Sequence, residues 1–125
     1  MKVQHFKLMI ASLVFVLLGF VSTAKADNQY TSPFYIPNGN VLLCTAMNVS
    51  KAAITVKINV IRPADGTITN TQEETVQPMT QTQVAVISPG GNYVCKFTTS
   101  DGTAIRADLS AYESYDHAYV VVPAR

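Results

Sequence analysis

Few side chains in this sequence could take part in a chemical reaction. Cys44 and Cys95 could supply a thiolate nucleophile or a redox pair, and the stretch ADLSAYESYDHAY, residues 107–119, gathers carboxylates, tyrosines and a histidine. A thiolate nucleophile needs a histidine nearby as its base. The chain has two histidines. His5 lies in an N-terminal stretch that we expect to be removed, which leaves His117 as the candidate base.

The two cysteines are more simply explained as a disulfide bond. Redox-active pairs usually follow C-x-x-C spacing at the start of a helix, where the pKa of the thiol falls, and neither feature occurs around Cys44 or Cys95. One pair in a small exported domain is typically a structural bridge. Closing a loop of this length stabilises a domain by about 4 kcal/mol in the chain-entropy treatment. Free thiols in the exported protein would return both cysteines to consideration as reactive groups.

No pattern in the sequence predicts a cofactor, a metal site or a catalytic residue. Blue-copper sites need two histidines with a cysteine thiolate, and catalytic zinc usually takes three protein ligands with more than one histidine. Calcium would accept the carboxylates of residues 107–119, but the sequence has no D-x-D-x-D ligand loop. The G-x-S-x-G, P-loop and G-x-G-x-x-G motifs are also missing. We therefore expect a protein that is not an enzyme.

Residues 107–119 predict a binding site better than a catalytic one. Adjacent residues of an extended strand point to opposite faces, which does not suit Asp116 and His117 as an acid–base pair. Tyrosine offers rigid contact area with a polar tip, as in antibody loops, and its ring can stack on a sugar. The candidate residues for binding a protein or glycan are Tyr112, Tyr115, Asp116, His117 and Tyr119. The alternative is that the tyrosines only pack against the end of the domain.

The first 26 residues, MKVQHFKLMIASLVFVLLGFVSTAKA, predict a signal peptide. Two lysines precede an apolar core of 14 residues, Leu8 to Val21, and the small residues Ala24 and Ala26 suit signal peptidase. A membrane anchor would need about 20 apolar residues. We expect cleavage after Ala26 and a secreted or periplasmic protein, with no membrane span in the mature chain.

The charge of the remaining chain argues against nucleic acid as a partner. Residues 27–125 hold six lysines and arginines against eight aspartates and glutamates, a net charge of −2. Nucleic-acid binding depends on clustered basic residues, and the sequence has no such cluster.

The reactive residues must be positioned by β-strands, because apolar and polar residues alternate and no segment repeats them at helical spacing. Alternation is clear in residues 54–60, 93–98 and 105–112, with shorter candidates at 82–88 and 118–124. Residues 41–49 are apolar on both faces, which favours a central strand. Residues 67–83 are polar and predict an exposed edge strand and loop.

Turn-forming residues separate these segments. The pair Asp101-Gly102 predicts a hairpin that joins the strand at 93–98 to the strand at 105–112. Six to eight short strands in residues 27–125 predict one all-β domain, an antiparallel β-sandwich of about seven strands.

The motif Gly91-x-Tyr93-x-Cys95, paired with Cys44, resembles immunoglobulin-like β-sandwich domains. In that family a tyrosine corner precedes the second cysteine of a disulfide between the sheets. The resemblance implies that Cys44 and Cys95 are the first and second cysteines and that Tyr93 is the corner residue. The buried tryptophan of the family is missing, because the chain has no tryptophan. The run from Val84 to Cys95 is also shorter than the segment that usually leads to the second cysteine in that family.

Three functions are consistent with the sequence. The first is a non-catalytic secreted module that binds a surface component or a partner protein. The second is a structural or assembly component of a surface polymer that pairs through strand edges. The third is a small secreted hydrolase that uses Glu113, Asp116 and His117. The oligomeric state does not follow from the sequence.

Overall fold

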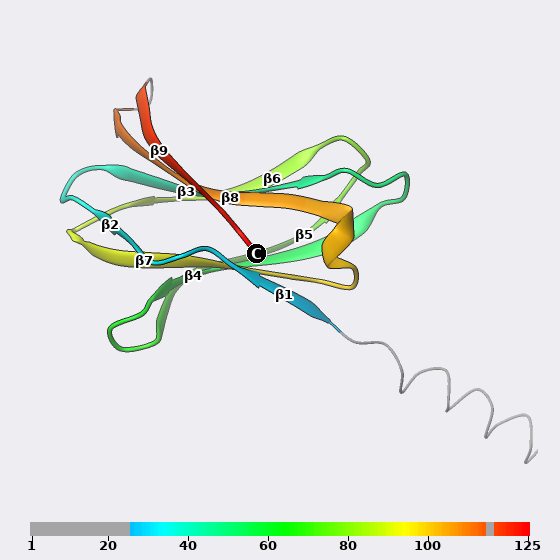
Figure 1. Ribbon diagram of the computed structural model, residues 1–125, viewed down its shortest axis with the longest axis horizontal. Helices are drawn as coiled ribbons and strands as arrows, with labels where there is room; N and C mark the ends of the chain where they lie inside the picture. The colour runs from blue at the N-terminus through cyan, green and yellow to red at the C-terminus, as the bar shows by residue number, and fades with distance from the viewer. Residues whose placement is uncertain (1–25, 115–116) are drawn as a thin grey trace, which may run out of the picture.

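The predicted β-sandwich is confirmed, with two antiparallel sheets packed face to face in the computed structural model (Figure 1). The structure describes residues 26–114 and 117–125. The predicted signal peptide therefore lies outside the described residues, apart from Ala26. The described chain forms nine strands, more than the seven expected.

Each sheet combines strands that are distant in the sequence. The five-stranded sheet has the order β1-β7-β4-β5, with β2 also paired to β7. Its strands are β1 (Asp27–Tyr30), β2 (Phe34–Ile36), β4 (Ile54–Arg62), β5 (Thr67–Val76) and β7 (Gly91–Thr99). The four-stranded sheet has the order β6-β3-β8-β9. Its strands are β3 (Val41–Asn48), β6 (Gln81–Ile87), β8 (Ile105–Ser114) and β9 (His117–Pro123).

The core lies between the sheets and follows the predicted alternation. One face of β4 is buried throughout, with Ile58 and Val60 fully enclosed. The facing residues of β3 and β8 include Leu42 and Leu109, which are also fully buried. The apolar segment at residues 41–49 is a central strand, as expected, because β3 lies between β6 and β8.

The connection after β7 differs from the predicted hairpin. The pair Asp101-Gly102 does not join two strands of one sheet, because β7 belongs to the five-stranded sheet and β8 to the four-stranded sheet. Asp101 instead caps a short 3-10 helix, Gly102–Ala104, and its carboxylate accepts hydrogen bonds from the backbone N–H and the hydroxyl of Thr103. Both bonds favour the ionised carboxylate and lower the pKa of Asp101. The chain thereby crosses from one sheet to the other.

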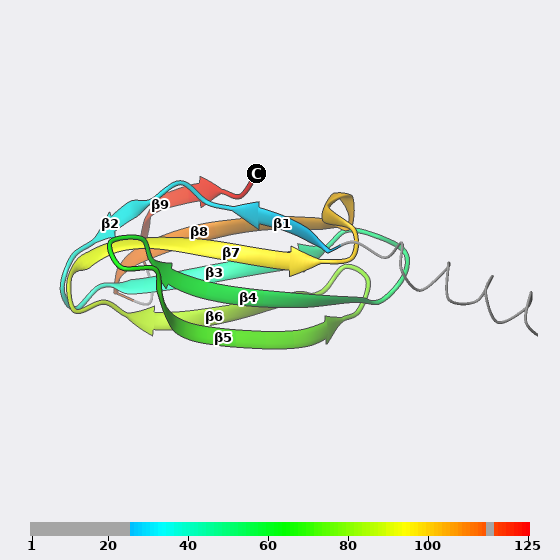
Figure 2. The ribbon, with the colours of Figure 1, turned by 90° about the horizontal axis from the view of Figure 1, so that it is seen from below.

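The two long sides of the sandwich are closed in different ways (Figure 2). On one side the predicted polar edge strand is present as β5, and it is joined to β6 by side chains. The Thr82 hydroxyl donates to the Glu74 carboxylate at 2.6 Å and accepts from the Gln72 amide at 2.9 Å. On the other side Tyr30 and Arg125 exchange backbone hydrogen bonds of 2.9 and 3.1 Å.

A buried asparagine fixes the connection between the sheets at the end of β3. The Nδ2 of Asn48 donates to the carbonyl oxygens of Ala52 and Val76, and its Oδ1 accepts from the backbone N–H and hydroxyl of Ser50. The tripeptide Asn48-Val49-Ser50 matches the N-glycosylation pattern. Glycosylation would attach at Nδ2, but this nitrogen is enclosed and fully hydrogen-bonded within the fold. The hydrogen bonds between Asn48 and Ser50 therefore account for this pair of residues.

Among the residues described, no helix is long and apolar enough to cross a membrane.

Candidate binding surface on the four-stranded sheet

Cys44 and Cys95 form a disulfide bond, as predicted from the sequence. Cys44 lies on β3 and Cys95 on β7, so the bond joins the two sheets through the core, with a Cα–Cα distance of 5.8 Å. Both residues are fully buried, and the chain has no other cysteine. The bridge leaves no thiol for chemistry.

The disulfide joins the two sheets, as in the immunoglobulin domains that the motif resembles, but the strand after Cys95 lies in the other sheet. Tyr93 is buried beside the bridge in the core. In immunoglobulin domains the strand that follows the second cysteine stays in the same sheet as that cysteine. Here β8 pairs with β3 in the opposite sheet. The immunoglobulin resemblance therefore does not extend to the strand order.

Two of the five predicted binding residues come together on the β8–β9 hairpin. Tyr112 lies on β8 and pairs in register with Ala118, so it is a near neighbour of Tyr119 on β9. Tyr112 is half-buried, whereas Tyr119 is 42% exposed and its hydroxyl accepts a hydrogen bond of 3.1 Å from the Asn40 amide.

The remaining three predicted residues receive little or no structural description. Tyr115 and Asp116 lie outside the described residues. His117 begins β9 and its backbone pairs with Ser114, but its side chain is not among those described.

The outward face of the four-stranded sheet carries two rows of apolar side chains next to this hairpin. Directly opposed residues of an antiparallel sheet share a face, and the register sets Ile87, Val41 and Tyr112 in one row. The next row contains Ala85, Leu43, Ser110 and Val121. We call the apolar members of these rows the apolar face: Val41, Leu43, Ala85, Ile87, Tyr112 and Val121.

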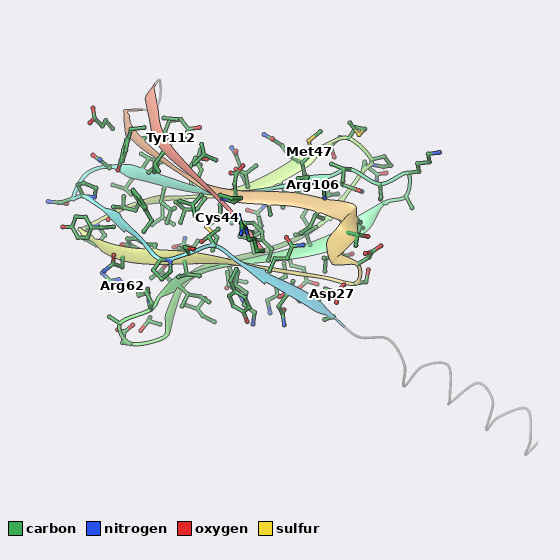
Figure 3. All side chains as sticks on the ribbon, in the orientation of Figure 1. Asp27, Cys44, Met47, Arg62, Arg106 and Tyr112 are labelled. Atoms are coloured by element: carbon green, nitrogen blue, oxygen red, sulfur yellow. A yellow bond between two sulfur atoms is a disulfide. The ribbon has the colours of Figure 1, made fainter. Side chains whose placement is uncertain are left out.

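The apolar face is open to solvent at its margins and hollowed near its centre. Ile87 is 65% exposed and Val121 is 58% exposed, and they lie on opposite outer strands of the sheet. Between them a shallow groove of about 220 Å³ is lined by Val41, Leu43, Gln83, Ala85 and Tyr112. Tyr112 lies at the hairpin end of the sheet and Arg106 farther along it (Figure 3).

The sheet face becomes polar away from the hairpin. The next row contains Gln83, Thr45 and Asp108, followed by Gln81, Met47 and Arg106. Partial burial raises the pKa of Asp108, and its contact with the Ser110 hydroxyl at 3.5 Å acts in the opposite direction. The apolar face therefore ends at a defined polar border.

The outward face of the other sheet is mixed. Its outward residues on β4 and β5 are polar at one end, including Thr55, Lys57 and Glu73, and apolar at the other, where Ile61 pairs with Ile68, which is 54% exposed. On β1 and β7, the Lys96 ammonium lies 5.8 Å from the centre of the Tyr30 ring. Both sheets therefore expose some apolar side chains, and the four-stranded sheet differs in that such side chains line a groove.

Sequence reasoning missed Leu43, Ala85, Ile87 and Val121. The signal was present in part, because residues 41–49 are apolar on both faces and residues 84–87 form an unbroken apolar run. A strand that is apolar on both faces favours a central position in a sheet, and the pattern does not show which of its residues face outward. Within the described chain, no group of three or more His, Cys, Asp and Glu residues could hold a metal ion.

Comparison with known proteins supports the fold and identifies no family. No protein-family profile matches the sequence, and no curated protein matches it either. A solved structure from Thermotoga maritima, "Crystal Structure of Thermotoga maritima 1070", is similar with a TM-score of 0.57 and 15% sequence identity. The similarity covers 78% of this chain and 91% of that one. At this identity the likeness concerns the fold alone.

Proposed function

We propose that this chain is an exported, non-catalytic β-sandwich domain that binds a partner protein through the apolar face. Large apolar patches on a soluble protein surface are characteristic of interaction sites. The observation that carries the proposal is the mostly apolar groove on the four-stranded sheet. Tyr112 lines this groove, and Ile87 and Val121 are exposed on either side of it.

The composition of the surface favours a protein over a glycan as the partner. Interface cores are depleted in charge and enriched in aromatic residues, and the residues of the apolar face carry no charge. Carbohydrate recognition needs polar groups that converge on the sugar hydroxyls. The groove has two polar groups, the Gln83 amide and the Tyr112 hydroxyl, and is otherwise lined by aliphatic side chains.

Export is the part of the proposal that rests on the N-terminal sequence. The positive start, the apolar core and the small residues before Asp27 support cleavage and translocation. The Cys44–Cys95 bond is consistent with this, because disulfides persist in oxidising compartments.

Site-specific photo-crosslinking tests the proposed surface. A photoreactive phenylalanine analogue is placed at Ile87, and in a second variant at Ile68, which is 54% exposed on β5 and serves as the matched control. Both variants are expressed in the cells that export the protein. We expect a discrete crosslinked species from position 87 and none from position 68.

A second substitution shows whether the crosslink depends on the apolar face. Ala85→Lys adds a charge within the groove and is expected to abolish the adduct, whereas Thr55→Lys on the five-stranded sheet is expected to leave it intact. Equal crosslinking from positions 87 and 68, or none from either, would contradict the proposal.

A further inference from the structure

A polar cleft lies on the five-stranded sheet, where two chain connections meet at one end of the sandwich. It lies between the turn that joins β4 to β5 and the segment that joins β6 to β7, and Figure 3 shows Arg62 beside that turn. Its volume of about 230 Å³ is below the range of about 300–1,000 Å³ typical of drug-sized ligands, which suits a ligand of the size of one sugar ring. The cleft is lined by Arg62, Ala64, Asp65, Gly90, Gly91 and Asn92.

The backbone of Asn92 offers a donor and an acceptor to this cleft. Cys95 on the same strand directs its backbone toward Thr31, because its C=O accepts from the Thr31 N–H and its N–H donates to the Thr31 hydroxyl. Backbone direction alternates along an antiparallel strand, so the N–H and C=O of Asn92 face β4. The ladder between β7 and β4 ends at Val94, and the same register sets Asn92 against Pro63, which has no N–H to donate. In the described chain, no backbone hydrogen bond joins Asn92 to β4 or to the turn after it.

The charged side chains of the cleft balance each other. Arg62 supplies a guanidinium, and Asp65 supplies a carboxylate that accepts a hydrogen bond of 3.0 Å from the Thr67 N–H. Hydrogen bonds from Thr67, and then the positive charge of Arg62, lower the pKa of Asp65, so this carboxylate is an ionised acceptor. The lining therefore combines donors and acceptors without a net charge, which suits a neutral ligand that carries hydroxyl groups.

An exposed aromatic ring lies at the edge of the cleft. Tyr35 on β2 pairs in register with Asn92, so the two side chains share the outward face of the sheet. The Tyr35 hydroxyl lies 3.7 Å from the position that a Cβ would take on Gly90, and the side chain is 58% exposed. An aromatic ring has a flat apolar face, against which the C–H face of a pyranose can stack.

We propose that this cleft binds one neutral pyranose ring, the terminal sugar of a glycan, stacked on Tyr35. The sugar hydroxyls donate to the Asp65 carboxylate and the Asn92 C=O, and they accept from Arg62 and the Asn92 N–H. A hydroxyl group both donates and accepts hydrogen bonds, which matches this mixed set.

The sugar site does not depend on the proposed protein-binding function. The apolar face belongs to the four-stranded sheet, and its groove has residues that are all different from those of the cleft. Failure of one proposal therefore leaves the other unchanged.

Titration of the exported protein with free sugars, followed by heteronuclear NMR, tests the site. The probes are D-glucose, D-galactose, D-mannose and N-acetyl-D-glucosamine, each added to millimolar concentrations. We expect at least one of them to shift the amide signals of Gly90, Gly91 and Asn92 in a saturable way. The amide signals of the apolar face should not move.

Substitutions of exposed residues test the contacts. Tyr35→Ala and Asn92→Ala are each expected to weaken binding at least about tenfold, and Tyr35→Phe, which keeps the ring, should bind more tightly than Tyr35→Ala. Tyr30→Ala is the matched control, because Tyr30 is also exposed on this sheet but lies opposite Lys96, about 13 Å from Asn92 along β7. It should bind as the native chain does. Circular dichroism verifies that each variant folds.

Three outcomes would overturn the proposal. The first is the lack of a shift with all four sugars, and the second is a shift that persists in both Tyr35→Ala and Asn92→Ala. The third is equal loss of binding in Tyr30→Ala, which would place the sugar elsewhere on the sheet. Inorganic phosphate serves as the competing probe, and shifts with phosphate but with no sugar would assign the cleft to an anion held by Arg62.

Discussion

Two buried threonine hydroxyls have opposite surroundings. Thr82 is 4% exposed, and its hydroxyl both donates a hydrogen bond to Glu74 and accepts one from Gln72. Thr99, 3% exposed, has a buried Oγ1 with no hydrogen-bond partner in the described part of the chain. Burying a hydroxyl without a partner destabilises a fold, whereas a satisfied hydroxyl contributes to it.

Replacing each threonine by valine separates these two cases. Thr99→Val keeps the shape and removes the unpaired hydroxyl, and we expect the free energy of unfolding to rise by about 1 kcal/mol. Thr82→Val leaves the Gln72 amide and the Glu74 carboxylate without their shared partner, and we expect a fall of about 1–2 kcal/mol. Urea unfolding measures both. A fall for Thr99→Val equal to that for Thr82→Val would show that the Thr99 hydroxyl is satisfied in solution.

At the scale of single residues, the sequence predicted the bridge and part of the surface. Cys44 and Cys95 were recognisable because a lone pair of cysteines in an exported chain has few alternatives. Tyr112 and Tyr119 were singled out by composition. Ile87 and Val121 were not, because an apolar residue in a short apolar run gives no sign of which face of the sheet it will occupy.

Asn48 holds the end of β3 against the end of β5 in the opposite sheet. Its amide donates to Val76 on β5 and to Ala52 in the connection to β4, with N···O distances of 2.9 and 2.8 Å. This side chain therefore links two sheets and one loop through a single buried group.

Asn48→Asp tests this element. The carboxylate keeps the bonds from Ser50 but cannot donate to Ala52 and Val76, and a charge would be buried, so we expect a loss of about 3 kcal/mol in the free energy of unfolding. Asn38→Asp, in the exposed turn before β3, is the control and should change stability by less than about 0.5 kcal/mol. Thermal and urea unfolding report the difference. Equal stability of the two variants would exclude a structural role for the Asn48 amide.

Most strands were predictable from alternation, from a short apolar run or, for β5, from a polar composition that suits an edge. β4, β7 and β8 show period-two patterns, and β3 shows the apolar run of a central strand. The segments DNQY of β1 and FYI of β2 are too short or too polar to show a pattern, and they are strands because β7 provides an edge. The pair Asp101-Gly102 suits a tight turn and a helix cap equally, and the choice depends on which sheet accepts β8.

The disulfide connects the halves of the whole molecule. Opening it removes a constraint on a loop of 51 residues, and Cys44→Ala with Cys95→Ala should lower the free energy of unfolding by about 4 kcal/mol. Urea unfolding of the double variant, compared with the native protein before and after reduction, measures this loss. Reduced native protein and the double variant should unfold at similar urea concentrations. A midpoint that neither treatment moves would mean that packing alone determines the stability.

The apolar face exists only in the assembled molecule. It depends on the register of four strands from three regions of the chain, β3, β6 and the β8–β9 hairpin. No local pattern contains that register, because β3 could pair with any apolar strand. The candidate surface therefore required the tertiary structure, although every residue in it belongs to a predicted strand.

The position of the bridge also determines how this domain would respond to tension. A force applied between β1 and β9 travels along the chain to Cys44, crosses the bond to Cys95 and continues through β7. Strands β4, β5 and β6 lie within the covalent loop and are not part of this covalent path. The fully extended chain is thereby shortened by about 170 Å, from 51 positions at roughly 3.4 Å each. Under load the unfolded domain therefore stays short while the Cys44–Cys95 disulfide is closed, and it lengthens abruptly when the disulfide is reduced.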